Sequence, residues 1–249
     1  MPSITTLTEV VILSAAPTGN LTSFPGQWSL NEHKTVLNWQ IEKFSHIGNL
    51  KEIFVGVGYD FANMVNLSNS VHFFHVMNWK KVNAAQSLAS APISKKRDLI
   101  ASYGDTLFEN DIIEELSKSE FDLTIVVDKP QQKTIRGGGA VNKSVEKILA
   151  NGEMVEFCGL FKIKQKLIKP FYELIDENVL NITLPQLLLE LNKRGTSLRF
   201  LNASKKWTEL NDPKDLAYFI FGTKAETLQS LIGILEYSKT LTPVVVEFS

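Results

Sequence analysis

Short apolar runs alternate with helix-forming segments along the first 128 residues, and this alternation limits the fold more than any other feature. The apolar runs predict five strands, over 10–13, 52–58, 71–76, 98–103 and 121–127. Strands that are separated by helices pair in parallel and need helices on both faces of their sheet. The order therefore predicts an α/β fold with a mostly parallel, Rossmann-like sheet.

Two helices of this half are marked by the spacing of their apolar residues. Such residues recur every three or four positions between 36 and 47, which predicts a helix with one apolar face. A shorter helix is predicted over 112–116, with Asp111 as its N-cap residue and Glu114 three positions later. Each helix stands between two predicted strands, as a crossover connection requires.

The composition changes after residue 128. The segment DKPQQKTIRGGGAVNKS (128–144) is polar and glycine-rich, and we interpret it as a small β-hairpin flap. The segments beyond it predict a strand over 154–163, helices over 168–175 and 184–192, and a strand over 197–202. Asp212 followed by Pro213 then predicts the start of a last helix, with Asp as N-cap and Pro at the first helical position.

The charge of the chain is nearly balanced, with 26 Lys and Arg against 27 Asp and Glu. No overall field draws it to nucleic acid or to a membrane surface, so an anionic ligand needs a local site. The one cysteine, Cys158, excludes an internal disulfide and is typical of a reducing compartment. The N-terminal apolar run is too short to span a bilayer. We expect a cytoplasmic protein without nucleic-acid or membrane partners.

Four segments occur in an order that resembles a known family. They read VVILSAAPTGNL (10–21), KTVLNWQIEKFSHIGNLKEIFVGVGY (34–59), NAAQSLASA with DLIASYGDTLF (83–91 and 98–108), and EFCGLFKI with LLLELNKRGTSLRFL and KWTELNDPKDL (156–163, 187–201 and 206–216). Together they resemble the nucleotidyltransferases that activate sugar phosphates and phosphocholine, above all the cytidylyl- and sugar-1-phosphate-transferring branch. The resemblance covers residues 8–217.

The resemblance implies a GT-A-type sheet in one domain over residues 1–217. It also implies a reaction in which a phosphate oxygen of the acceptor attacks the α-phosphorus of a nucleoside triphosphate and releases pyrophosphate. Such a protein aligns two anions and neutralises their charge, which requires Mg²⁺ on carboxylates and phosphates. CTP is the favoured nucleotide, and a phosphorylated small molecule for surface polysaccharide or lipid assembly is the expected acceptor.

The metal ligands of the family fall on two positions of this chain. Asp105 follows a predicted strand and a glycine, so its carboxylate should emerge at the carboxyl edge of the sheet, where α/β proteins bind ligands. We interpret Asp105 as a catalytic metal ligand, or alternatively as a residue that caps a turn. The second ligand falls at Asn211, where an amide replaces the family's carboxylate and binds Mg²⁺ more weakly.

The acceptor half of the resemblance implies further site residues. Gly159 and Glu209 fall where the acceptor is bound. Lys162 is a candidate for a catalytic cation, and the alternative is a solvated surface lysine.

The signature loop of the family departs from its usual pattern here. Its arginine falls at Asn20 and its Pro-Lys pair at Pro25 and Gly26, and no Lys or Arg occurs between Val10 and His33. Backbone N–H groups of this loop can still bind phosphate. The nucleotide-binding residues that the resemblance implies are Leu13, Ser14, Ala15, Ala16, Gly19, Asn20, Asn83, Ser87 and Gly104.

Residues 218–249 lie beyond the usual end of the family and predict a helix followed by a strand. The segment GTKAETL (222–228) is similar to the leading segment of phosphoenolpyruvate-synthase-like kinases. A fused or neighbouring kinase is therefore one interpretation of this extension, and simple packing against the domain is the other.

The sequence leaves two alternatives to a catalytically active nucleotidyltransferase. The missing cations and the amide at Asn211 fit a non-catalytic relative that binds nucleotide and partners a kinase. A glycosyltransferase of related architecture usually carries Asp-x-Asp after the strand, whereas this chain has Gly104, Asp105 and Thr106.

Overall fold

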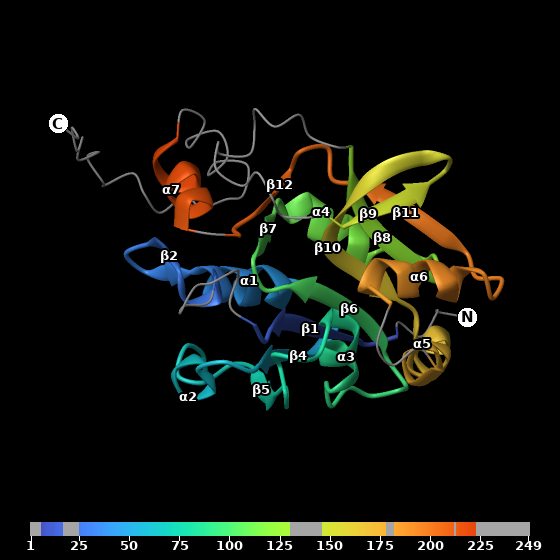
Figure 1. Ribbon diagram of the computed structural model, residues 1–249, viewed down its shortest axis with the longest axis horizontal. Coiled ribbons are helices and arrows are strands. Elements are labelled where there is room, and N and C mark those ends of the chain that lie inside the picture. The colour runs from blue at the N-terminus through green and yellow to red at the C-terminus, as the bar shows by residue number, and fades with distance from the viewer. Residues whose placement is uncertain (1–5, 17–24, 130–145, 178–181, 212, 223–249) are drawn as a thin grey trace.

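The computed structural model describes residues 6–16, 25–129, 146–177, 182–211 and 213–222. Its centre is an eight-stranded sheet with the order β11-β8-β10-β6-β1-β4-β5, and β9 pairs with β10 (Figure 1). The strands are β1 (Thr8–Ser14), β4 (Leu50–Val57), β5 (His72–His75), β6 (Asp98–Tyr103), β8 (Leu123–Asp128), β9 (Lys147–Ala150), β10 (Glu153–Ile163) and β11 (Leu198–Asn202).

Every strand pair of this sheet is parallel except the pairs that β10 makes. Strand β10 runs antiparallel to β6, β8 and β9. Because β1, β6 and β8 point the same way, their carboxyl ends meet at one edge, and the amino-terminal half of β10 lies at that edge too. The expected α/β fold with a mostly parallel sheet is therefore confirmed.

Helices cover both faces of the sheet. Val10 and Ile12 of β1 face one core, with α1 (Val36–Ser45), α4 (Asn110–Ser117) and α7 (Pro213–Phe221). Val11 faces the other core, with α3 (Ala84–Ala89), α5 (Gln165–Glu177) and α6 (Leu184–Asn192). Successive side chains of a strand point to opposite faces, so a run of apolar residues needs both cores. Each buried aliphatic side chain contributes about 1.5–3 kcal/mol to stability.

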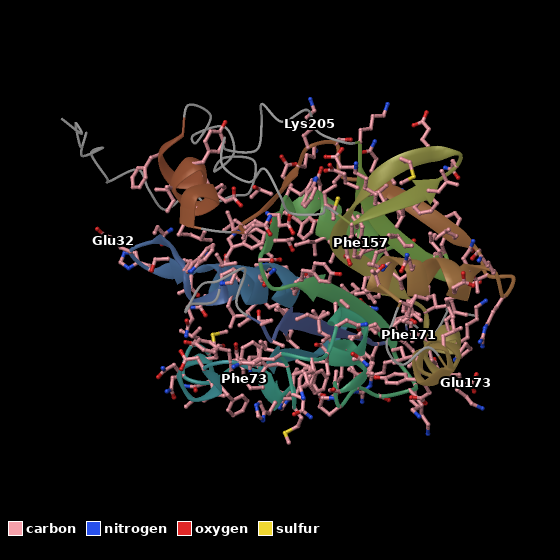
Figure 2. All side chains as sticks on the ribbon, in the orientation of Figure 1. Glu32, Phe73, Phe157, Phe171, Glu173 and Lys205 are labelled. Carbon is pink, nitrogen blue, oxygen red and sulfur yellow. The ribbon has the colours of Figure 1, made fainter. Side chains whose placement is uncertain are left out.

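The helices of the second core have a clear apolar side. In α5, Phe171 is fully buried and Glu173, two residues later, lies at the surface (Figure 2). Helix α6 begins with a capping box: Thr183 accepts from Gln186 N, and Gln186 Oε1 accepts from Thr183 N. These helices lie side by side over the β8–β10–β6 part of the sheet (Figure 1).

Short elements complete the described chain. The 3-10 helix η1 (Pro25–Gln27), the two-stranded pair β2 (Ser29–Asn31) and β3 (Lys34–Thr35), and α2 (Phe61–Met64) lie around the amino end of α1 and after β4. A separate antiparallel ladder joins β7 (Thr106–Phe108) to β12 (Trp207–Glu209). This ladder connects parts of the chain that are far apart in sequence.

The start of α4 differs from the prediction. Its N-cap residue is Glu109, not Asp111, and Glu109 makes no side-chain capping bond. The backbone N–H of Glu109 donates to Lys206 O at 3.0 Å, and this ties the helix start to the chain that leads into β12. Asp111 lies in the first turn and forms an ion pair with Lys206.

Three other predictions fall wholly or partly on residues that the structure does not describe. The predicted flap falls largely on residues 130–145, which the structure does not describe. The predicted N-cap residue Asp212 also lies outside the described residues. The structure does describe the β9–β10 hairpin, which begins just after residue 145. The predicted domain boundary at 217/218 falls inside α7, and residues 223–249 lie outside the described part. Among the described helices, none is both long and apolar enough to cross a lipid bilayer.

Candidate active site

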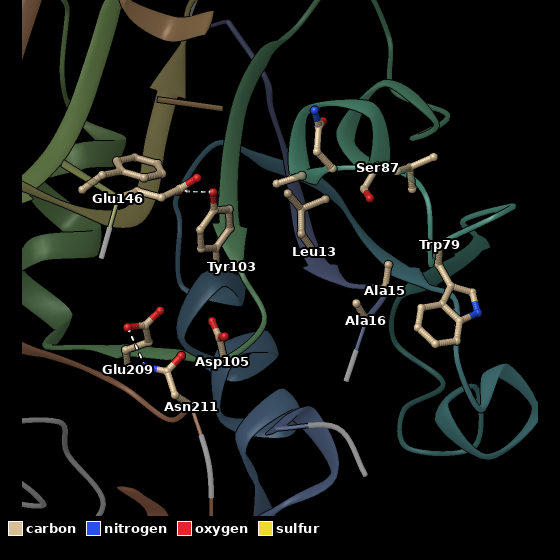
Figure 3. A pocket seen from close by; sticks show the side chains of 14 residues that line it. Leu13, Ala15, Ala16, Trp79, Ser87, Tyr103, Asp105, Glu146, Glu209 and Asn211 are labelled. Atoms are coloured by element: carbon tan, nitrogen blue, oxygen red, sulfur yellow. Dashed lines mark hydrogen bonds between the residues drawn. The ribbon is translucent and has the colours of Figure 1, made fainter. Parts of the chain in front are cut away.

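A cavity of about 370 Å³ lies at the carboxyl ends of β1 and β6 (Figure 3). Eight of the residues that the sequence predicted for the site line it: Leu13, Ala15, Ala16, Asn83, Ser87, Asp105, Glu209 and Asn211. Six further lining residues were not predicted: Trp79, Val82, Ala84, Tyr103, Glu146 and Phe157.

The two strand ends at the base of the cavity are in direct contact. Leu13 of β1 is the register partner of Tyr103 of β6, and Gly104 N donates to Leu13 O at 2.9 Å. A Cβ atom on Gly104 would lie 1.9 Å from the Ser14 Oγ atom, so this position accepts only glycine. Ser14 and Gly104 thus support the cavity from behind, and neither is among its lining residues.

The loop after β1 forms one wall of the cavity. Ala15 and Ala16 line it, and Ala15 O accepts a hydrogen bond from Tyr59 N at 3.1 Å. Beside them lies the Trp79 ring (Figure 3), which packs edge-on against Tyr59. Gly19 and Asn20, the remaining predicted loop residues, lie outside the described ranges.

The cavity is acidic. Asp105, Glu146 and Glu209 line it, and none of the described lining residues is Lys, Arg or His. Gly26, which falls where the family has lysine, is buried, and a Cβ atom there would meet Met64 Cε at 3.3 Å. Next to the lining residue Trp79, exposed Lys80 places its Nζ 5.3 Å from the centroid of the Trp79 ring.

The β7–β12 ladder brings the two predicted metal ligands together. Thr106 pairs with Glu209, and beyond this pair Leu210 N donates to Asp105 O at 2.7 Å. Asp105, Glu209 and Asn211 therefore face the same side of the cavity (Figure 3). The Asn211 side-chain nitrogen donates to Glu209 Oε2 at 2.7 Å, which orients the amide within this group.

This group of oxygen ligands is chemically suited to Mg²⁺. Magnesium takes oxygen ligands, usually one or two protein carboxylates completed by water and substrate phosphates. Among the described residues, no set of three or more His, Cys, Asp or Glu is placed to hold a metal ion unaided. Asp105 with Glu209 and Asn211 thus fits an ion that arrives with a nucleotide and completes its shell from the phosphates.

A second acidic corner consists of Tyr103 and Glu146. The Tyr103 hydroxyl donates to Glu146 Oε2 at 2.6 Å. Burial, followed by the charge of Glu146, raises the pKa of Tyr103 well above its ordinary value, so the phenol stays protonated. Burial, followed in the same direction by the charge of Glu209, raises the pKa of Glu146, although the bond from Tyr103 acts the other way.

Gly159 shapes this second corner without lining the cavity. It has φ +74° in the irregular part of β10, where the register with β8 shifts between Phe157 and Phe161. A Cβ atom on Gly159 would lie 2.7 Å from the Tyr103 ring. The absent side chain leaves room for Tyr103, whose ring packs edge-on against Phe157 with centroids 5.7 Å apart.

Asn83 and Ser87 reach the cavity from α3, as the sequence predicted for base recognition. The Asn83 side chain is committed within the protein: Oδ1 accepts from Gln86 N, and Nδ2 donates to Ile182 O at 3.1 Å. Asn83 therefore holds the start of α3 and ties it to the chain before α6. Ser87 is 5% exposed, and its side chain lies at the cavity (Figure 3).

The structure does not bring Lys162 to the cavity. It is 2% exposed, so it is also no solvated surface lysine. Its Nζ donates to Ser117 O at 2.6 Å and to Ser119 O at 3.0 Å, and it lies 3.7 Å from Asp98 Oδ2. Burial, followed by the charge of Lys164, lowers its pKa. Lys162 therefore holds the end of α4 against the sheet and is not a lining residue of the cavity.

Comparison with known proteins bears on the family resemblance and on the fold. No family model matches the chain. The CTP:phosphoglutamine cytidylyltransferase of Campylobacter jejuni is 24% identical, with 74% of this chain and 87% of that protein covered. The sequence resemblance to nucleotidyltransferases is thereby confirmed.

Solved structures show the same fold. The inositol-1-phosphate CTP transferase of T. maritima superposes with a TM-score of 0.63 at 16% identity, covering 92% of this chain and 97% of that one. The 4-diphosphocytidyl-2C-methyl-D-erythritol synthase of Anaerococcus prevotii gives 0.59 at 14% identity, covering 90% and 96%. The chain and these enzymes are alike over nearly their whole lengths.

Proposed function

We propose that this chain, which has the fold of the nucleotidyltransferases, is a cytidylyltransferase. It transfers the cytidylyl group of CTP to the phosphate of a small molecule and releases pyrophosphate. Three proteins of similar sequence or fold are named for CTP transfer or for a cytidylyl product. Surface polysaccharide or lipid assembly remains the expected destination of the product.

One observation carries the proposal. The loop after β1 and the acidic group after β6 line a single cavity at the carboxyl edge of the sheet, where α/β proteins bind nucleotides. The first wall offers small residues, Ala15 and Ala16, that allow a phosphate chain to approach the backbone. The second offers the carboxylates of Asp105 and Glu209. The two walls together fit the two reactants, the nucleoside triphosphate and the phosphorylated acceptor that attacks its α-phosphorus.

The residues of the chain act by positioning. Asp105, with Glu209 and Asn211, would hold Mg²⁺ at the edge of the sheet. A bound Mg²⁺ neutralises charge on the triphosphate and makes the α-phosphorus more electrophilic. The β1 loop and Gly104 fix the distance between the nucleotide and this group, because the strand ends leave no free space between them. Ser87 and the adjoining α3 face the base end of the cavity.

Pyrophosphate release tests the proposal. The purified chain is incubated with MgCl₂ and each of the four nucleoside triphosphates in turn. The acceptors are phosphoglutamine, inositol 1-phosphate, glucose 1-phosphate and phosphocholine. We expect release with CTP and at least one acceptor, and none when MgCl₂ is replaced by EDTA.

The acidic cavity favours one other function, a non-catalytic nucleotide-binding domain that partners a kinase. None of the described lining residues supplies a cation, and Asn211 replaces a carboxylate. Nucleotide binding in calorimetry, without pyrophosphate release for any acceptor, would establish this alternative and overturn the proposed transfer. The kinase partner itself is suggested by residues 222–249, most of which lie outside the described ranges.

A further inference from the structure

The acidic corner formed by Tyr103 and Glu146 lines the same cavity as the predicted metal ligands, but it is built from other elements. Glu146 immediately precedes β9, whereas Asp105, Glu209 and Asn211 are joined by the β7–β12 ladder. Figure 3 shows Glu146 and Tyr103 together on one side of the cavity and the Asp105 group on another. A carboxylate that faces a ligand cavity apart from the metal ligands is available to select the acceptor.

The negative charge of the cavity restricts which acceptors can bind there. A phosphorylated acceptor brings about two negative charges at neutral pH, because the second pKa of a phosphate monoester is near 6. It meets three carboxylates, and no Lys, Arg or His is among the described lining residues. One Mg²⁺ on the Asp105 group offsets only part of this excess. An acceptor that itself carries a positive group offsets more of it.

The chemistry of the corner fits such a positive group. Aromatic rings attract cations through their faces, and a neighbouring carboxylate adds direct charge attraction. Tyr103 and Phe157 both line the cavity and stand edge to face, with an angle of 88° between their rings. The Tyr103 hydroxyl holds the Glu146 carboxylate at the edge of this aromatic pair. Gly159 keeps the space that the Tyr103 ring needs.

We infer that the acceptor carries an ammonium or amino group beside its phosphate, and that Glu146 with Tyr103 and Phe157 binds this cation. The inference rests on the proposed cytidylyl transfer and names the class of its acceptor. The raised pKa of Glu146 agrees with it: burial leaves the carboxylate short of compensating charge, and a bound cation supplies that charge.

A matched pair of acceptors tests the inference. Phosphocholine and 3,3-dimethylbutyl phosphate have nearly the same shape, but only the first carries a positive charge. Phosphoethanolamine and propyl phosphate form a second pair. With CTP and MgCl₂, we expect kcat/KM for each cationic acceptor to exceed that of its neutral partner at least tenfold.

Two variants locate the selection. Glu146→Gln should bring the ratio within each pair close to one, because it removes the charge and keeps the shape. Tyr103→Phe keeps the ring and should retain most of the preference. Glu153→Gln is the control: this carboxylate is exposed at the start of β10 and is not a lining residue of the cavity, so the ratio should not change.

The outcomes separate this inference from the proposed function. Equal use of the neutral acceptors, or a preference for glucose 1-phosphate, overturns the inference and leaves the cytidylyl transfer standing. Absence of pyrophosphate with every acceptor overturns the transfer, and calorimetry of the same pairs then decides the inference. Tighter binding of phosphocholine than of its neutral partner supports a cation site, and equal binding refutes it.

Discussion

The backbone N–H of Leu210 donates a 2.7 Å hydrogen bond to the carbonyl oxygen of Asp105. This bond extends the β7–β12 ladder by one step, to the point where the chain enters the cavity. It fixes the distance between a strand end of the nucleotide half and the acceptor half of the protein. The backbone of Asp105 is consequently joined to both halves of the protein, independently of its carboxylate.

Asp105→Asn should lower kcat by on the order of 100-fold, because the amide removes the charge that would hold Mg²⁺ and keeps the shape. Pyrophosphate release measures the loss, and thermal unfolding should show an unchanged melting temperature. Glu120→Gln is the control, since its side chain is 88% exposed and lies away from the cavity. Full activity of the Asp105 variant would remove this residue from the mechanism.

Lys162→Met should destabilise the protein without a specific effect on catalysis. The variant leaves two carbonyl oxygens and Asp98 without the buried ammonium. Removing one partner of a buried charge pair costs about 3–5 kcal/mol, and we expect the lower end because Lys164 still lies 3.4 Å from Asp98.

Urea unfolding measures this loss of stability. Lys166→Met removes an ion pair between an exposed lysine and partly buried Asp122, and should cost no more than about 1 kcal/mol. If Lys162→Met instead lowered kcat at unchanged stability, the sequence-based assignment of Lys162 as a catalytic residue would return.

Gly159→Ala and Gly152→Ala form a matched pair. Both glycines have positive φ, +74° and +85°, so each alanine carries a backbone strain of about 1–2 kcal/mol. Only Gly159 has a neighbour in the way, the Tyr103 ring at 2.7 Å from the new Cβ, whereas nothing lies within 4 Å at Gly152. We expect Gly159→Ala to be the more destabilising and to raise KM for the acceptor. Equal effects of the two substitutions would show that Tyr103 adapts freely.

Glu146→Gln should change how stability depends on pH. The folded pKa of Glu146 lies above its ordinary value, so between the unfolded and folded pKa values the folded protein binds more protons. The contribution of Glu146 to stability therefore falls as pH rises through that window and stays low above it. Glutamine does not titrate and can still accept the Tyr103 hydroxyl bond.

Denaturant unfolding of both proteins at about pH 4.5 and about pH 7.5 measures how the stability difference between them changes with pH. The variant should gain stability relative to the unchanged protein on going to the higher pH. Glu153→Gln again serves as the control and should show no such gain. The same substitution that removes acceptor selection would then stabilise the fold, as is common at binding sites.

Much of the fold follows from local patterns in the sequence. Strands such as β1 and β6 have apolar centres, and several successive strands of the first half are separated by a helix. That order places Asp105 at the carboxyl edge, because it directly follows β6. The strand direction of β10 is a different matter: its residues look like any buried strand, and only its partners make it antiparallel.

The parts of the site that sequence reasoning missed lack such patterns. Trp79 and Glu146 lie in connections between elements, where neither period nor spacing marks a position. Tyr103 and Phe157 belong to apolar strands, where an aromatic residue is ordinarily part of the core. The burial of Lys162 was not predicted, because a lysine is ordinarily exposed and the two carbonyl oxygens that accept from it belong to a distant segment, at the end of α4.

The short ladder between β7 and β12 also sets the order in which the site can arise as the chain is made. Proteins emerge from the ribosome with the amino end first, and early segments begin to fold before later ones are synthesised. Strand β7 directly follows Asp105 and emerges long before Trp207–Glu209, the strand with which it forms its ladder. An unfinished polypeptide can therefore assemble the wall formed by β1 and β6, but it lacks Glu209 and Asn211, which the proposed transfer requires.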